Sequence, residues 1–184
     1  ALKLFLEASH YSHEPSVKAV KYMVSNYIGS GGNTVDLVDF LKFHAQPTAE
    51  SEGDLFSQVH LADHIRGDNC VWVGGESESC ANDTPYIEDV NELRKSFYYF
   101  EMAAKQGDVR SQYVSGMMNL MGVGVPRNVP LAIDWLTPLA ENGNAHVAFI
   151  IGEIFQDGYW VPQDQISAND WFALANERSH PGAK

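Results

Sequence analysis

The sequence predicts an all-α protein, a right-handed α-solenoid of about four antiparallel helix hairpins with one long loop insertion. The first observation is a repeated frame: "GVGVPRNVPLAIDW" (122–135) returns in looser form as "GYWVPQDQISANDW" (158–171). A fixed period of this kind is typical of stacked repeats. Six pairs recur at one offset of 36 residues, namely Gly107/Gly143, Gly116/Gly152, Gly122/Gly158, Pro126/Pro162, Ala132/Ala168 and Trp135/Trp171.

The second observation is helical spacing between turn residues. In the segment 111–121, apolar and small residues recur at three- and four-residue steps, so they share one helix face. Gly122 and Gly124 end this helix, because glycine adopts the left-handed cap conformation without steric cost. Asn128 then caps a second helix that has Pro130 in its first turn. The small residues Gly116 and Ala132 let the paired helices approach closely.

The repeat register divides the chain into units. "GDLFSQ" (53–58) matches "GDVRSQ" (107–112) at a shift of 54 residues, which is one period of 36 plus 18. The partner helix at 91–107 keeps the 36-residue frame, so the excess is an insertion at 67–89. We predict one repeat domain over 1–184, with units at about 13–52, 53–106, 107–142 and 143–177 and a tail at 178–184.

The aromatic run "SFYYF" (96–100) lies in this partner helix. Tyr99 occupies the position of Trp135, and helical geometry turns Phe97 and Phe100 onto the neighbouring stripe. These three residues are therefore expected in the core, with Tyr98 pointing outward.

The insertion has six acidic residues and no basic one. Its carboxylates suit a basic patch on a partner, and its two large aromatic residues suit interface anchors. The alternative is that the insertion is a solvated loop that contacts no partner. The predicted partner-binding residues of the insertion are Asp68, Trp72, Glu76, Glu78, Asp83 and Tyr86.

Cys70 and Cys80 are the two cysteines of the chain, with nine residues between them. Two thiols alone exclude a four-cysteine zinc site. A disulfide between them would close a short loop and favour an oxidising compartment, periplasmic or secreted, over the cytoplasm. The alternative is a pair of unrelated free thiols in a cytosolic protein.

His60, Asp63 and His64 lie in "HLADH", with the two histidines four positions apart. Two imidazoles at this spacing face the same way and suit zinc or copper if a third ligand comes from elsewhere. The register aligns the histidines with Val114 and Met118, which lie outside the packing signature of the repeat. We therefore interpret all three residues as exposed partner contacts and predict no bound metal and no cofactor.

The chain carries 24 acidic and 12 basic residues, a net charge of −12. The negative electrostatic field of such a chain repels phosphate backbones and anionic lipid headgroups. Neither nucleic acid nor a membrane surface is therefore an expected partner. No apolar run reaches the roughly 20 residues that cross a bilayer. A basic protein or peptide is the expected partner, and the chain is expected as a monomer or weak oligomer. The alternative is that the acidity serves solubility.

The frame resembles the Sel-one-like repeat, a relative of the tetratricopeptide repeat. "SQYVSGMMNLMGVGVPRNVPLAIDWLTPLAENG" carries the glycines, the G-x-G-V, the Ala132 and Trp135 pair and the closing glycine of that family. Asn119 replaces the usual aromatic, and Tyr159-Trp160 replaces the centre of the second G-x-G. The resemblance implies a solenoid that binds proteins or peptides on a curved surface, with bacterial members similar to adaptors and to immunity proteins.

Motifs for catalysis are absent: the sequence has no S-x-x-K, K-T-G, G-x-S-x-G, H-E-x-x-H or Walker-type loop. The glycine-rich "GSGGN" (29–33) falls at the expected turn of the first unit. The predicted function is therefore non-enzymatic protein binding, as an adaptor or as an inhibitor of the immunity type. The alternative is a protein that recognises β-lactams or another small ligand, which the resemblance implies for cysteine-rich members.

Overall fold

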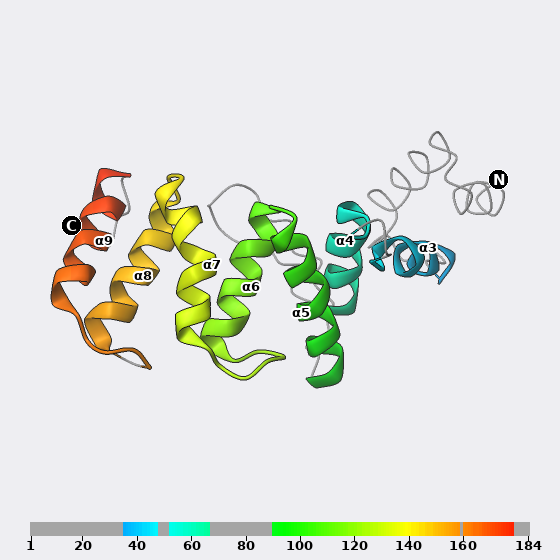
Figure 1. Cartoon of the computed structure of the whole chain (residues 1–184), viewed down its shortest axis with the longest axis horizontal. Helices are drawn as coiled ribbons and strands as arrows, with labels where there is room; N and C mark the ends of the chain where they lie inside the picture. Colours follow the sequence, from blue (N-terminus) through cyan, green and yellow to red (C-terminus); the bar gives the residue numbers. More distant parts are fainter. Residues whose placement is uncertain (1–34, 48–51, 67–89, 159, 179–184) are drawn as a thin grey trace, which may run out of the picture.

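The computed structural model describes residues 35–47, 52–66, 90–158 and 160–178. These residues form seven α-helices and no strand, stacked side by side along one long axis (Figure 1). The predicted all-α solenoid of helix hairpins is confirmed. The helices are α3 (Val35–Ala45), α4 (Leu55–Arg66), α5 (Val90–Lys105), α6 (Val109–Met121), α7 (Val129–Glu141), α8 (Ala145–Asp157) and α9 (Gln165–Glu177).

Each described helix packs against the next one along the chain, from α3 through α9. Helices α6 and α8 begin 36 residues apart, at Val109 and Ala145, and so do α7 and α9, at Val129 and Gln165. The turns after α6 and α8 lie at the lower edge in Figure 1, where α5 also begins. The limits of the individual units stay a prediction.

Local sequence sets the ends of the helices as expected. The Asp108 carboxylate accepts a hydrogen bond from the Ser111 backbone N–H at 2.7 Å and so caps α6. Gly122 ends α6 with φ of 75°, and its N–H donates to the Met118 carbonyl at 2.9 Å. Asn128 caps α7 through the Leu131 N–H at 3.2 Å, with Pro130 in the first turn.

Close approach of paired helices depends on glycine, as the repeat pattern predicts. A Cβ atom on Gly116 of α6 would lie 2.8 Å from the Leu136 side chain of α7. The equivalent atom on Gly152 of α8 would lie 2.5 Å from the Phe172 ring of α9. Ala132 of α7 is fully buried. In each of these two hairpins, a larger side chain in place of the glycine would push the paired helices apart.

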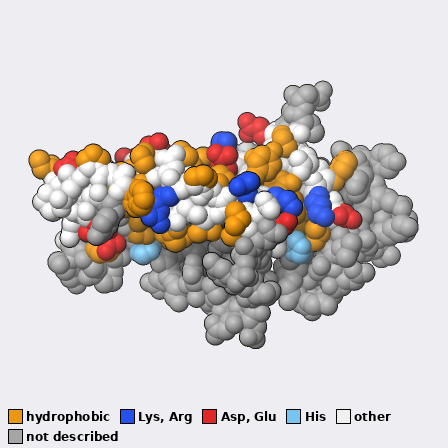
Figure 2. All heavy atoms as spheres, turned by 90° about the horizontal axis from the view of Figure 1, so that it is seen from below, with side chains coloured by type: hydrophobic (Ala, Val, Ile, Leu, Met, Phe, Trp, Pro, Cys, Tyr) orange, Lys and Arg blue, Asp and Glu red, His pale blue; other side chains and the backbone are white. Residues whose placement is uncertain are grey.

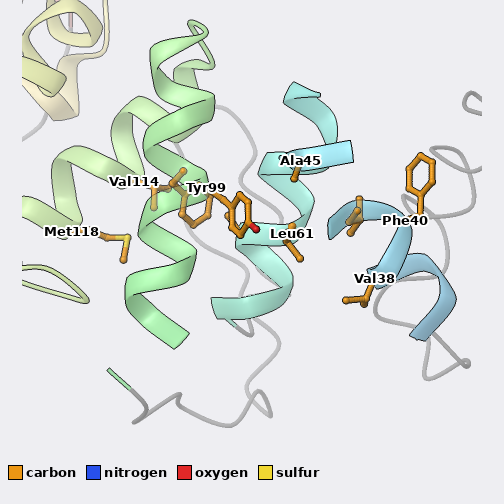
Figure 3. Packing of buried hydrophobic residues seen from close by; sticks show 10 residues of the cluster. Val38, Phe40, Ala45, Leu61, Tyr99, Val114 and Met118 are labelled. Carbon is orange, nitrogen blue, oxygen red and sulfur yellow. The ribbon is translucent and has the colours of Figure 1, made fainter. Parts of the chain in front are cut away.

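Two clusters of buried apolar residues hold the array together, and Tyr113 of α6 packs against both. The first joins α3, α4, α5 and α6 and contains Phe40, Leu61 and Phe100 (Figure 3). The second joins α7, α8 and α9. The prediction for the aromatic run is confirmed, because Phe97 packs on the first cluster while the exposed fractions are 9% for Tyr99, 0% for Phe100 and 45% for Tyr98.

Several predictions fall outside the described residues: the first helix of the first unit, the insertion at 67–89 with the Cys70–Cys80 pair, and most of the tail. Where the chain is described, no helix has both the length and the apolar character needed to span a bilayer.

Candidate partner-binding groove

A groove with a volume of about 720 Å³ opens between α3, α4 and α5. Helix α3 supplies one wall, the last turns of α4 supply the floor, and the first half of α5 supplies the other wall. The lining residues come from helices that are consecutive in the described structure but far apart in sequence: Lys42, Gln46, Leu61, Ile65, Glu92, Arg94, Lys95, Tyr98 and Tyr99.

The floor of the groove is apolar with one fixed polar contact. Leu61 is fully buried, and Tyr99 is nearly so. The Gln46 amide donates to the Tyr99 hydroxyl oxygen at 2.5 Å across the 53 residues that separate them in sequence. Burial raises the pKa of the Tyr99 hydroxyl, although this hydrogen bond acts in the opposite direction. Tyr99 is therefore neutral at physiological pH, and its link to Gln46 ties α3 to α5.

The rim of the groove is positively charged. Lys42 lies on the α3 wall and Arg94 and Lys95 lie on the α5 wall, while Glu92 is the one acidic residue in the lining. Lys95 pairs with Glu92 at 2.5 Å, and Lys42 pairs with Asp39 at 3.4 Å. Both pairs are exposed, so each contributes little to stability. Arg94 has no ion-pair partner among the described residues.

The rest of the described array has the opposite charge. From residue 129 to residue 177 the chain has seven acidic residues and no Lys or Arg, and six of those carboxylates are exposed. Figure 2 shows most of the Lys and Arg side chains of that face towards the α3–α5 half of the molecule. Among the described residues the charge is therefore divided: α7–α9 are acidic, and the groove is basic.

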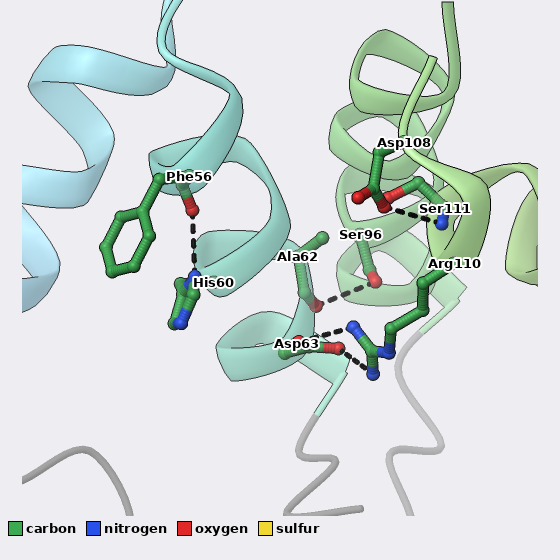
Figure 4. Close-up of polar contacts among 8 residues, drawn as sticks. All are labelled: Phe56, His60, Ala62, Asp63, Ser96, Asp108, Arg110 and Ser111. Carbon is green, nitrogen blue, oxygen red and sulfur yellow. Dashed lines mark hydrogen bonds and ion pairs between the residues drawn. The ribbon is translucent and has the colours of Figure 1, made fainter. Parts of the chain in front are cut away.

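The structure corrects the interpretation of His60. Val114, its register partner, is a core residue with an exposed fraction of 8%, although the register placed it outside the packing signature. His60 is accordingly half-buried: its Nδ1 lies 2.9 Å from the Phe56 carbonyl oxygen, and its ring stacks on Phe56 at 3.9 Å between centroids (Figure 4). The expectation that His60 is exposed is wrong, because its ring packs along α4 on Phe56; its role as a partner contact stays a prediction.

His64 lies one turn further along α4 and is exposed, as expected. Partial burial of its ring and the charge of Lys42 both lower its pKa, so it is neutral at physiological pH. No group of three or more His, Cys, Asp and Glu residues is placed to hold a metal ion within the described part of the chain.

Asp63 is engaged inside the protein. Arg110 of α6 donates to both carboxylate oxygens of Asp63, at 2.7 and 2.8 Å (Figure 4). The guanidinium carbon also lies 5.8 Å from the centroid of the Phe100 ring. Nearby, the Ser96 hydroxyl donates to the Ala62 carbonyl at 2.9 Å. The predicted contact residue Asp63 is thus part of a bond between helices α4 and α6.

We expect Asp63→Asn to lower the free energy of unfolding by about 1–2 kcal/mol. The substitution removes a charge-assisted, bidentate ion pair whose two side chains are each less than a quarter exposed. Urea unfolding followed by circular dichroism measures this. The matched control is Asp39→Asn, which breaks an exposed pair and is expected to change stability by less than about 0.5 kcal/mol. Equal effects of the two substitutions would contradict the assigned role of Asp63.

The remaining predicted contacts, which are Asp68, Trp72, Glu76, Glu78, Asp83 and Tyr86, lie outside the described residues, as do Cys70 and Cys80. The described ends of that segment, Ile65 on α4 and Glu92 on α5, both line the groove. The described helix ends on either side of that segment thus border the groove.

A tryptophan occupies a backbone position that elsewhere in the array needs glycine. Trp160 has φ of 70° and is 36 residues after Gly124, which has φ of 71°. Trp160 is 70% exposed, and the Arg127 guanidinium carbon lies 5.0 Å from the centroid of its ring. The departure from the glycine pattern at this turn therefore changes the surface and leaves the backbone conformation of the repeat intact.

Stacked helix hairpins with glycine at their crossings and an open groove define a tetratricopeptide-like repeat scaffold. The chain belongs to the Sel1 repeat family, whose model, described as "Sel1 repeat", matches residues 89–108, 109–144 and 145–180. The chain is 27% identical over 81 residues to a putative sel1-like repeat-containing protein, R815, of Acanthamoeba polyphaga mimivirus. That match covers 44% of this chain and 15% of the relative.

Two solved structures share the fold. One is c5321, a protective antigen present in uropathogenic Escherichia coli strains that displays an SLR fold, with a TM-score of 0.61 and 20% identity. The match covers 99% of this chain and 34% of that one. The other is a Sel1 repeat protein from Oxalobacter formigenes, with a TM-score of 0.55 and 20% identity over 80% of this chain and 36% of that one. The chain thus spans about a third of these structures.

Proposed function

We propose that the chain is a non-enzymatic scaffold that binds another protein, as an adaptor or as an inhibitor of the immunity type, with the groove between α3, α4 and α5 as its main contact surface. Proteins built from Sel1 repeats generally mediate protein–protein interaction, and this membership supports the proposal. The proposal does not require a cofactor.

The observation that carries the proposal is the lining of the groove. It combines aromatic and aliphatic surface with long charged side chains, which is the composition of a contact surface. None of the nine lining residues is Ser, Cys, Asp or His, and Glu92 is the single carboxylate. The described lining therefore holds no Ser, Cys or His nucleophile with its base and no pair of carboxylates for acid–base work. These residues favour binding over catalysis.

The exposed carboxylates of α7–α9 support a basic partner. Residues 129–177 have seven acidic side chains and no Lys or Arg, so they produce a negative field over α7, α8 and α9. Such a field speeds association with a positively charged protein and weakens as salt is added. The acidic insertion at 67–89 is proposed to add to this attraction.

The test is capture from extracts of the source cells with the intact chain as bait, followed by calorimetry with the purified partner. A basic protein is expected, with an affinity that falls about tenfold between roughly 50 and 300 mM NaCl. Neutralising Asp134, Glu153 and Asp170 on α7, α8 and α9 should weaken binding by a similar factor.

The matched control neutralises Asp39 on α3, Glu52 before α4 and Glu101 on α5, which lie outside the groove lining, with the same charge change and little expected loss. A partner that binds independently of salt and of both triple variants would contradict the proposed basic partner. Deletion of residues 70–86 tests the insertion separately: unchanged binding would remove its proposed role.

A further inference from the structure

We propose that the groove between α3, α4 and α5 binds an acidic, extended segment of a partner protein, with an aromatic or aliphatic side chain of that segment on the groove floor. The inference rests on the proposed function and goes further. It assigns an acidic ligand to the groove, whereas the acidic helices α7–α9 are proposed to attract a basic surface of the partner. A partner that fits both sites is itself dipolar.

Three cations flank the groove from two separate helices. Lys42 approaches from α3, and Arg94 and Lys95 approach from α5. Lys95 already has Glu92 as a local counter-ion, whereas Arg94 has no ion-pair partner among the described residues. An unpaired guanidinium presents a planar fork of donors that matches a carboxylate. Carboxylates placed along a strand of peptide would reach both walls at once.

The accessible apolar area between these cations comes from Ile65 and Tyr98, which lie over the fully buried Leu61. Leu61 and Ile65 lie one helical turn apart on α4, and the ring of Tyr98 on α5 is 45% exposed. An exposed tyrosine beside a buried leucine suits one apolar side chain from a ligand, since Tyr supplies a large contact area with little loss of conformational entropy. The Tyr99 hydroxyl is already bonded to Gln46, so it serves as a fixed part of this floor.

Size and charge together favour a protein segment over other anionic ligands. A volume of about 720 Å³ accommodates a few residues of an extended chain and excludes a folded domain. A nucleic acid is longer than the groove, so its phosphates would extend beyond the three cations over a chain whose net charge of −12 opposes binding. A short acidic segment contacts only the basic groove, so it avoids this repulsion.

The experiment uses a fluorescein-labelled peptide of about ten residues composed of Glu, Leu, Tyr and Gly, with fluorescence anisotropy as the readout. We expect saturable binding of this peptide to the full chain and no binding of a matched peptide with Lys in place of Glu. Arg94→Glu and Lys42→Glu should each raise the dissociation constant about tenfold, and Tyr98→Ala should raise it several-fold.

The matched control is Lys105→Glu, which makes the same charge change on the exposed surface of α5 outside the groove lining. It should change the dissociation constant less than about twofold. Circular dichroism and thermal unfolding of every variant verify that the array is folded, and an unfolded variant is replaced by Lys95→Gln. A single-stranded oligonucleotide of similar charge is expected not to bind.

Three results would overturn the inference: no binding of the acidic peptide, equal loss in Arg94→Glu and Lys105→Glu, or tighter binding of the oligonucleotide than of the peptide. Each of these leaves the proposed function testable by itself, through the captured partner. If that partner binds and its affinity falls in Tyr98→Ala but not in Arg94→Glu, the groove is the contact surface and its assigned ligand chemistry is wrong.

Discussion

Replacing Gly116 with valine is expected to lower the free energy of unfolding by about 3 kcal/mol, at the upper end of what overpacking costs. Gly116 lies at the crossing of α6 and α7, where even a Cβ atom would be 2.8 Å from Leu136. Leu136 is fully buried in the second cluster, where other core side chains surround it. The two helices must therefore separate, and the contacts between them are lost along their length.

A double-mutant cycle with Leu136→Ala checks this by urea unfolding. Leu136→Ala alone leaves a cavity and destabilises the protein by about 2–5 kcal/mol. In the double variant the valine fills part of that cavity, so the combined loss should be smaller than the sum of the two losses by about 1 kcal/mol or more. Additive losses would mean that Gly116 is not held against Leu136.

Replacing Phe100 with alanine is expected to destabilise the protein by about 4 kcal/mol. The ring is fully buried in the cluster that joins α3, α4, α5 and α6, and Arg110 lies over it. Its removal leaves a cavity between four helices and takes away the apolar support of the Arg110–Asp63 contact.

The control for Phe100→Ala is Tyr98→Ala, two residues away on the same helix and 45% exposed. This change removes a ring of similar size from the groove side and is expected to cost less than about 1 kcal/mol. Thermal unfolding of the two variants under identical conditions gives the comparison. Similar losses for the two variants would contradict the placement of the core on the Phe100 side of α5.

Features determined by neighbouring residues were predictable from the sequence. Gly122 ends α6, Asn128 begins α7 and Gly116 marks the crossing, because each effect depends on residue type within one helical turn. The outward position of Tyr98 followed from helical periodicity for the same reason.

Features formed between helices were not predictable. Asp63 and Arg110 are 47 residues apart, and no motif relates them, so a carboxylate on α4 was interpreted as a free contact. The groove combines Lys42 of α3, Leu61 of α4 and Arg94 of α5, and the net charge of the chain predicted an acidic surface where the groove is basic. His60 was misplaced because a single register match does not show which face of α4 packs.

The most direct test of the groove as the contact surface is hydrogen–deuterium exchange of the intact chain with and without its captured partner. We expect slower exchange on binding in the parts of the three helices that line the groove. These are Val35–Ala45, the last turns of Leu55–Arg66 and the first half of Val90–Lys105. Protection confined to the helices from Val129 to Glu177, with unchanged exchange in the groove helices, would contradict it.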